Sequence, residues 1–210
     1  MTHAHHGTPV VAEGAALDAA RGAVVMIHGR GAGPDNILEL VPVIGRPSFA
    51  YLAPAAANRT WYPSSFMRPF AENEPFLSAA LTRIGEVLSD LAARGVPAER
   101  VVLLGFSQGA CLAGEYAVRH PQRYGGVVML SGGLIGPPGT TWPTTGRLLE
   151  TPVFLGCSDR DAHIPKDRVD ESAAVFEQMG AEVTERIYPN MGHLVTSDEI
   201  VFVRAMLDHL

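Results

Sequence analysis

The chain has 210 residues, a formal net charge of −6, 47% hydrophobic residues and 18% charged residues. This length suits one folded domain with a substantial buried core. The negative charge disfavours binding to nucleic acid or to an anionic membrane surface. No apolar run approaches the roughly 20 residues that a membrane-spanning helix needs.

The N-terminal segment contains three histidines but neither the basic nor the apolar region of a secretory signal. We expect an N-terminal tail with a short β segment over residues 1–22, followed by a single α/β domain over residues 23–210. His3, His5 and His6 fit a frayed polar tail better than a metal site, because no cysteine or carboxylate accompanies them. We predict no metal and no cofactor.

Short apolar segments alternate with helix-length segments along the rest of the chain. This alternation predicts a mostly parallel sheet with right-handed crossovers and helices on both faces. The segments 101–106 and 126–131 are nearly all apolar, as expected for strands covered on both faces. The expected strands are 23–28, 49–53, 101–106, 126–131, 152–156 and 182–188. The expected helices span about 35–44, 74–94, 108–119, 165–179 and 196–209.

A G-x-S-x-G pentapeptide at residues 105–109 follows one expected strand and precedes a helix rich in small residues. This context is typical of a nucleophile elbow, a strained turn that exposes the serine hydroxyl at the end of a strand. Glycines at 105 and 109 leave room where a Cβ would collide with a neighbouring strand or helix. The pattern also occurs by chance in a chain with 22 glycines, but its context favours Ser107 as a nucleophile.

A serine nucleophile needs a base, and the base needs an orienting acid. With this type of elbow, the acid and then the histidine follow the serine along the chain. His193 lies in a turn-rich loop between the last expected strand and the last helix, from which it can reach Ser107. His120 ends the helix after the elbow, His209 is next to the C-terminus and His163 precedes another helix, so His193 is the favoured base.

The acid is expected in the loop that follows the buried segment 152–156. Asp159 and Asp161 compete for this role. One can orient the histidine while the other pairs with Arg160 or caps the helix that begins near Pro165. The spacing to Pro165 favours Asp161, and a solvated loop carboxylate is the alternative for both.

The oxyanion of a tetrahedral intermediate needs hydrogen-bond donors. One expected donor is the backbone N–H of Gln108, the residue after the nucleophile. The second is expected from the glycine-rich loop after strand 23–28, where the N–H of Arg30 is the favoured donor. A phosphate cradle is a weaker interpretation, because the loop lacks the usual phosphate-binding glycine pattern and Pro34 interrupts its amides.

Two long connections, 53–73 and 131–151, leave strands at the same edge as the elbow. Such loops are often functional, although their aromatic residues can equally serve as buried anchors. Neither is long enough for a substantial cap domain, so an open site is expected. The predicted substrate-contacting residues are Trp61, Tyr62, Phe66, Leu134 and His163.

The chain has two cysteines, Cys111 and Cys157, which are too few for a disulfide scaffold. Cys111 is expected on the buried face of the helix after the elbow, and Cys157 at a strand end. Both are most simply interpreted as reduced core thiols, which predicts a cytoplasmic protein.

These motifs occur in the order seen in the phospholipase/carboxylesterase family of α/β-hydrolases, which the chain resembles over about residues 23–208. The resemblance implies a single-domain α/β-hydrolase with minimal or no cap domain. It also implies a catalytic triad of Ser107, Asp161 and His193. The oxyanion hole would be formed by the backbone N–H groups of Arg30 and Gln108. The stretches that carry it are His28-Gly29, Trp61-Tyr62-Pro63, residues 105–109, residues 161–165 and Gly192-His193.

Two positions depart from the family pattern. Ala162 follows the expected acid where proline is common, and Arg30 stands where thioesterase members often have an apolar residue. The second departure disfavours long-chain acyl-protein substrates and brings the chain closer to small bacterial carboxylesterases.

The resulting prediction is a serine hydrolase that cleaves carboxylic esters or thioesters of small, partly apolar substrates through an acyl-enzyme. The expected partner is a small-molecule ester, and the prediction allows for a homodimer. One alternative is a dienelactone hydrolase-like lactonase, although such enzymes typically carry a cysteine nucleophile. The other is a non-catalytic binding protein with the α/β-hydrolase fold, which would be signalled by a broken triad.

Overall fold

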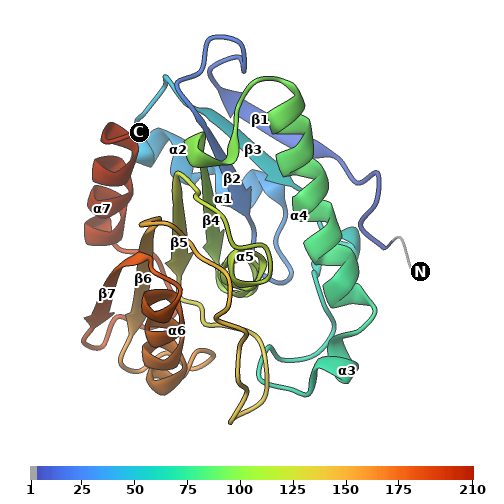
Figure 1. The fold of residues 1–210 in the computed structure, drawn as a ribbon, viewed down its shortest axis with the longest axis vertical. Coiled ribbons are helices and arrows are strands. Elements are labelled where there is room, and N and C mark those ends of the chain that lie inside the picture. Colours follow the sequence, from blue (N-terminus) through green and yellow to red (C-terminus); the bar gives the residue numbers. More distant parts are fainter. Residues whose placement is uncertain (1–3) are drawn as a thin grey trace.

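The computed structural model describes residues 4–210 and contains a seven-stranded sheet in the order β1-β3-β2-β4-β5-β6-β7 (Figure 1). β1 is antiparallel to β3, and the other neighbouring strands are parallel. The prediction of a mostly parallel sheet is therefore confirmed. The strands are β1 Val10–Gly14, β2 Ala23–Ile27, β3 Ala50–Pro54, β4 Val101–Phe106, β5 Gly126–Leu130, β6 Pro152–Ser158 and β7 Glu182–Tyr188.

Helices cover both faces of this sheet (Figure 1). Buried residues of α4, α5 and α6 form one core with the sheet, and those of α1, α2 and α7 form a second core on the other face. The α-helices are α1 Pro34–Leu38, α2 Leu40–Ile44, α3 Phe70–Asn73, α4 Phe76–Ala93, α5 Gln108–Arg119, α6 Lys166–Gln178 and α7 Ser197–Asp208. Two short 3₁₀ helices are η1 Ala57–Arg59 and η2 Ala98–Arg100.

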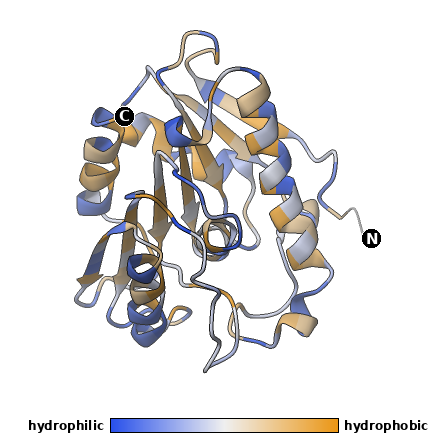
Figure 2. Cartoon of the chain, in the orientation of Figure 1, coloured by the Kyte–Doolittle hydropathy of each residue, from blue (hydrophilic) through white to orange (hydrophobic). Residues whose placement is uncertain are grey.

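The alternation of side chains along β2 shows how the strands serve both cores. Val25 and Ile27 belong to the core under α4, α5 and α6, whereas Val24 and Met26 belong to the opposite core. All these residues are fully buried, as expected for a strand with both faces covered. Figure 2 shows mostly hydrophobic central strands, and mostly hydrophilic residues along α6.

Two expected helices differ from the structure. The expected helix 35–44 is two helices that meet at Glu39. Pro42 has no N–H to donate to the carbonyl of Leu38, the last residue of α1, so a continuous helix would lack this bond. The expected helix 74–94 begins only at Phe76, because the residue before Pro75 is held in an extended conformation.

The prediction of a frayed N-terminal tail is wrong for His5. This side chain is fully buried, and its Nε2 lies 3.0 Å from the carbonyl oxygen of Trp61. His6 pairs with Glu86 of α4 across 2.8 Å, while His3 lies outside the described residues. These contacts join segments more than 50 positions apart, which spacing along the chain does not reveal.

The parallel strands bring four connections to one edge of the sheet. The glycine-rich loop follows β2, the elbow follows β4, the acidic loop follows β6 and the loop with His193 follows β7. Ligand sites of open α/β sheets lie at this carboxyl edge. Within residues 4–210, no helix combines the length and the apolar character required to cross a bilayer.

Candidate active site

Ser107 lies on a sharp turn between β4 and α5, with φ 55° and ψ −119°. A non-glycine residue in this region is strained, and the turn is held by a 2.9 Å hydrogen bond from the Ser107 N–H to the carbonyl of Leu130. A Cβ at Gly105 would overlap the backbone of Gly109, and a Cβ at Gly109 would overlap the carbonyl of Ile27. The two glycines therefore permit the close packing that raises the serine above the strand.

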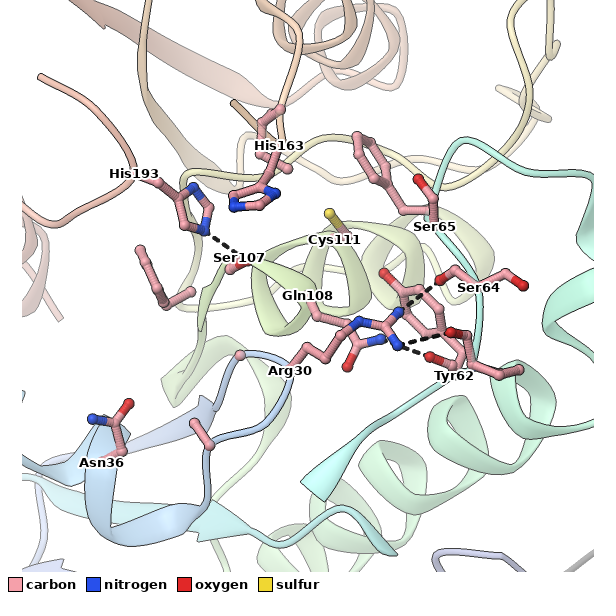
Figure 3. Close-up of a pocket in the computed structure, with 16 residues that line it drawn as sticks. Arg30, Asn36, Tyr62, Ser64, Ser65, Ser107, Gln108, Cys111, His163 and His193 are labelled. Carbon is pink, nitrogen blue, oxygen red and sulfur yellow. Dashed lines mark hydrogen bonds between the residues drawn. The ribbon is translucent and has the colours of Figure 1, made fainter. Parts of the chain in front are cut away.

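The structure brings Ser107, His193 and Asp161 into one hydrogen-bonded chain. His193 Nε2 lies 2.8 Å from Ser107 Oγ (Figure 3), and His193 Nδ1 lies 2.7 Å from Asp161 Oδ2. The other carboxylate oxygen, Oδ1, accepts from the backbone N–H groups of His163 at 2.8 Å and Ile164 at 3.1 Å. The spacing of Asp161 before a short turn thus gives this carboxylate two backbone donors as well as the imidazole.

These contacts determine the charge of Asp161. Burial by itself raises the pKa of this carboxyl group, but the hydrogen bonds from His193, His163 and Ile164 outweigh burial and leave the pKa below its ordinary value. The carboxylate is therefore ionised at neutral pH and accepts the proton on Nδ1 of His193. This arrangement leaves the lone pair of Nε2 directed at the serine hydroxyl.

Asp159 is an exposed loop carboxylate that does not contact the histidine but binds a backbone amide. Its Oδ1 accepts a 2.7 Å hydrogen bond from the N–H of Asn190, and Ser158 Oγ accepts one from Gly192 at 3.2 Å. Among residues 4–210, Asp159 neither pairs with Arg160 nor caps a helix. The end of β6 thereby anchors the loop that carries His193.

The glycine-rich loop after β2 is fixed at its start by His28. His28 Nε2 accepts a 3.1 Å hydrogen bond from the N–H of Ala56, and its Nδ1 donates to the carbonyl of Gly29 at 2.8 Å. Trp61 Nε1 donates to the carbonyl of His28 at 2.9 Å, and the two rings lie 5.1 Å apart. The indole of Trp61 is thus a buried anchor for this loop.

A cavity of about 590 Å³ lies over Ser107 and His193. Of the five predicted substrate-contacting residues, Tyr62, Phe66 and His163 line it. Trp61 and Leu134 do not, because both side chains are fully buried in the core. Sequence analysis did not identify the further lining residues Asn36, Ser64, Ser65, Phe106, Cys111 and Ile164.

The sequence model of the phospholipase/carboxylesterase family matches residues 6–210. The chain belongs to this family. A member from Dyadobacter fermentans has a crystal structure that is 40% identical with a TM-score of 0.91, and the match covers 96% of this chain and 97% of that one. The α/β-hydrolase fold is therefore shared over nearly the whole length.

Two relatives with different names illustrate the range of similarity. Acyl-protein thioesterase 1 of Saccharomyces cerevisiae is 30% identical to this chain over 132 residues, which cover 61% of this chain and 57% of the yeast protein. A probable carboxylesterase of Oryza sativa subsp. japonica is 24% identical over 205 residues, covering 87% and 86%. The match thus spans little more than half the length of the yeast thioesterase.

The two amides expected at the oxyanion hole belong to cavity-lining residues of this family member. Gln108 is the first residue of α5, where an N–H has no partner within the helix. The N–H of Arg30 has no hydrogen-bond partner among residues 4–210. Both amides are consequently available to a ligand oxygen.

More polar side chains line the cavity than the loop sequences suggested. Arg30, Asn36, Ser64, Ser65 and Gln108 supply polar groups beside the aromatic rings of Tyr62 and Phe66. Small polar residues in irregular loops follow no periodic pattern, so only their adjacency to Trp61-Tyr62-Pro63 could have pointed to them. Within the described part of the chain, no group of three or more His, Cys, Asp or Glu side chains could hold a metal ion.

Proposed function

We propose that this protein is a serine hydrolase that cleaves carboxylic esters or thioesters of small, partly apolar substrates through an acyl-enzyme. The observation that carries the proposal is the hydrogen-bonded chain from Ser107 through His193 to Asp161. Membership of the phospholipase/carboxylesterase family supports the same chemistry. The proposed oxyanion donors are the backbone N–H groups of Arg30 and Gln108.

Acylation begins when Ser107 Oγ attacks the ester carbonyl carbon and its proton moves to His193 Nε2. The carbonyl oxygen becomes an oxyanion, which accepts hydrogen bonds from the amides of Arg30 and Gln108. As the tetrahedral intermediate collapses, the bond to the leaving oxygen or sulfur breaks and His193 returns the proton to that atom. The ionised carboxylate of Asp161 stabilises the imidazolium throughout.

Deacylation repeats these steps with water. His193 Nε2 removes a proton from a water molecule, whose oxygen attacks the acyl carbon bound to Ser107 Oγ. Collapse of the second intermediate releases the carboxylic acid and returns the proton to Ser107. The cavity of about 590 Å³ beside the serine is the space in which the acyl group and the attacking water meet.

The experiment that tests this proposal compares Ser107→Ala with Ser89→Ala, a control on the exposed surface of α4. With short p-nitrophenyl esters, Ser107→Ala is expected to lower kcat by on the order of 10⁴–10⁶, as for loss of a nucleophile in comparable enzymes. Ser89→Ala should retain wild-type kcat. A fluorophosphonate should label Ser107 alone; retained activity in Ser107→Ala, or a label on another residue, would contradict the proposal.

The same assays separate the two alternative functions. A lactonase would turn over lactones in preference to linear esters, and a binding protein would bind a ligand without becoming labelled. A cytoplasmic location also stays our prediction. Its support is that Cys111 and Cys157 are both free and buried, which fits a reducing compartment.

A further inference from the structure

The side chain of Gln108 binds the segment of residues 61–64, of which residues 62–64 line the cavity. Gln108 Oε1 accepts a 3.0 Å hydrogen bond from the N–H of Trp61, and Nε2 donates to the carbonyl of Tyr62 at 2.8 Å. The side chain is buried, so these bonds are shielded from competing water. The residue after the nucleophile is thus hydrogen-bonded to the backbone of two successive residues, Trp61 and Tyr62.

The side chain of Arg30 binds the next two peptide groups of the same segment. Arg30 Nη1 donates to the carbonyl of Pro63 at 2.8 Å, and Nη2 donates to the carbonyl of Ser64 at 2.6 Å (Figure 3). The guanidinium also lies over the ring of Tyr62, 5.9 Å from its centroid. Charge-assisted bonds in a fork geometry fix direction as well as distance.

The segment 61–64 is itself attached to the core at both ends. Trp61 is fully buried and donates to the carbonyl of His28. The N–H of Ser64 donates to Oδ1 of the buried Asn73 at 2.8 Å, and Asn73 Nδ2 donates back to the carbonyl of Ser65 at 3.0 Å. A segment anchored in this way can serve as a fixed reference for the loops beside it.

We propose that the segment 61–64 sets the spacing between the two oxyanion donors, with the side chains of Arg30 and Gln108 as the connecting struts. This inference rests on the proposed function, in which the backbone amides of these two residues bind the oxyanion. The peptide group that contains the Arg30 N–H is already held at its carbonyl, because Gly29 O accepts from His28 Nδ1 at 2.8 Å and from the Ala32 N–H at 3.3 Å. The guanidinium contacts hold Arg30 from the opposite side, and Arg30 acts through its side chain as a positioning residue.

Such side-chain contacts matter because stabilisation of an oxyanion depends strongly on the distance to its hydrogen-bond donors. Donors contribute when they lie about 2.7–3.1 Å from the developing oxyanion, and loss of one donor costs about 10²–10³ in kcat. A donor that moves out of this distance range stabilises the transition state less, whereas binding of the substrate in the ground state is unchanged. Removal of the Arg30 side chain should therefore lower kcat and leave KM near its wild-type value.

The test compares Arg30→Met, Arg30→Lys and the wild type, with Arg94→Met as a control at the exposed end of α4. Arg30→Met keeps the aliphatic stem and should lower kcat for a p-nitrophenyl ester about tenfold, a fraction of the loss of a whole donor. Arg30→Lys should recover part of this loss through a single ammonium donor. Affinity for a trifluoromethyl ketone, whose serine adduct carries an oxyanion, should fall by the same factor as kcat.

A second measurement does not depend on activity. Hydrogen–deuterium exchange of peptides that cover residues 28–36 should be faster in Arg30→Met than in the wild type, with an unchanged Tm. Wild-type exchange, an unchanged kcat, or a raised KM with unchanged kcat would overturn the strut proposal. If the wild type neither hydrolyses esters nor labels with a fluorophosphonate, the proposed function fails, and the exchange rates still decide whether Arg30 fixes the loop.

Discussion

Cys157 Sγ lies 3.8 Å from Asp161 Oδ2, the oxygen that also contacts the imidazole of His193. Burial, together with the nearby carboxylate of Asp161, raises the pKa of the Cys157 thiol to about 12. Burial raises the pKa of Cys111, which lines the cavity, to about 12 as well. Both sulfurs are therefore neutral at physiological pH, and the thiol of Cys157 faces Asp161 as a hydrogen-bond donor.

We expect both cysteines to resist alkylation in the folded protein. With a pKa of about 12, only about one thiol in 10⁴ is ionised at pH 8, and the thiolate is the reactive form. Intact mass after iodoacetamide treatment should show no adduct under native conditions and two adducts in urea. Rapid modification of the native protein would contradict the assignment of Cys111 and Cys157 as neutral buried thiols.

The two aspartates of the acidic loop should differ sharply when each is changed to asparagine. Asp161→Asn replaces the acceptor of the His193 Nδ1 proton, which favours the wrong tautomer and should lower kcat by about 10⁴, as in a comparable triad. Asp159→Asn only weakens the anchor to Asn190 and should cost far less. Steady-state kinetics with one ester decide this matter; similar losses in both variants would show that Asp161 has no special part.

The buried His5 should make folding stability depend on pH. Burial is the main cause that lowers its pKa from the ordinary value of 6.5, and the neutral form is required because Nδ1 accepts from the N–H of Ala57 at 3.0 Å. Below about pH 6.5 the unfolded chain binds this proton more readily than the folded protein. Stability that is present above pH 6.5 is therefore lost as the pH falls toward the lower pKa of the folded state.

His5→Asn tests this dependence, because asparagine keeps an acceptor for Ala57 but does not titrate. The drop in Tm between pH 7.5 and 5.5 should be smaller in His5→Asn than in the wild type. His209→Gln, at an exposed position near the end of the chain, is the matched control and should show the wild-type drop. An equal drop in all three proteins would exclude His5 as a source.

The buried guanidinium of Arg168 should support the long connection after β5. Arg168 donates to the carbonyls of Leu134 at 2.8 Å and Gly136 at 2.7 Å, and its side chain is only 1% exposed. Arg168→Met leaves these carbonyls unsatisfied and should lower the free energy of unfolding by about 3 kcal/mol. Arg123→Met removes one exposed contact to the same connection and should cost less than about 1 kcal/mol. Urea denaturation measures both; equal losses would contradict this role.

Local patterns were sufficient for the elements that create the site edge. The run of apolar residues before Ser107 and the small residues after it predicted a strand, a turn and a helix, and the structure has β4 and α5 at these positions. Gly105 and Gly109 were interpretable because backbone packing at a turn excludes any Cβ. The order of strands along the chain was enough to expect His193 and the acidic loop at the same edge.

The direction of side chains in irregular segments could not be read in the same way. Trp61 and Leu134 were expected in the cavity but are core anchors, because no periodicity assigns a loop residue to the inside or the outside. Asp159 and Asp161 are two positions apart, yet one binds the His193 imidazole and the other the backbone of Asn190.

The sequence by itself determined the alternating elements, the elbow and the chain order of its chemical groups, since these depend on neighbours along the chain. Only the tertiary structure decided that His5 is buried, and that the side chains of Arg30 and Gln108 both bind the backbone of residues 61–64. Such contacts join residues that are 30 or more positions apart. Their geometry depends on how the loops pack over the sheet, and no short stretch of chain contains that information.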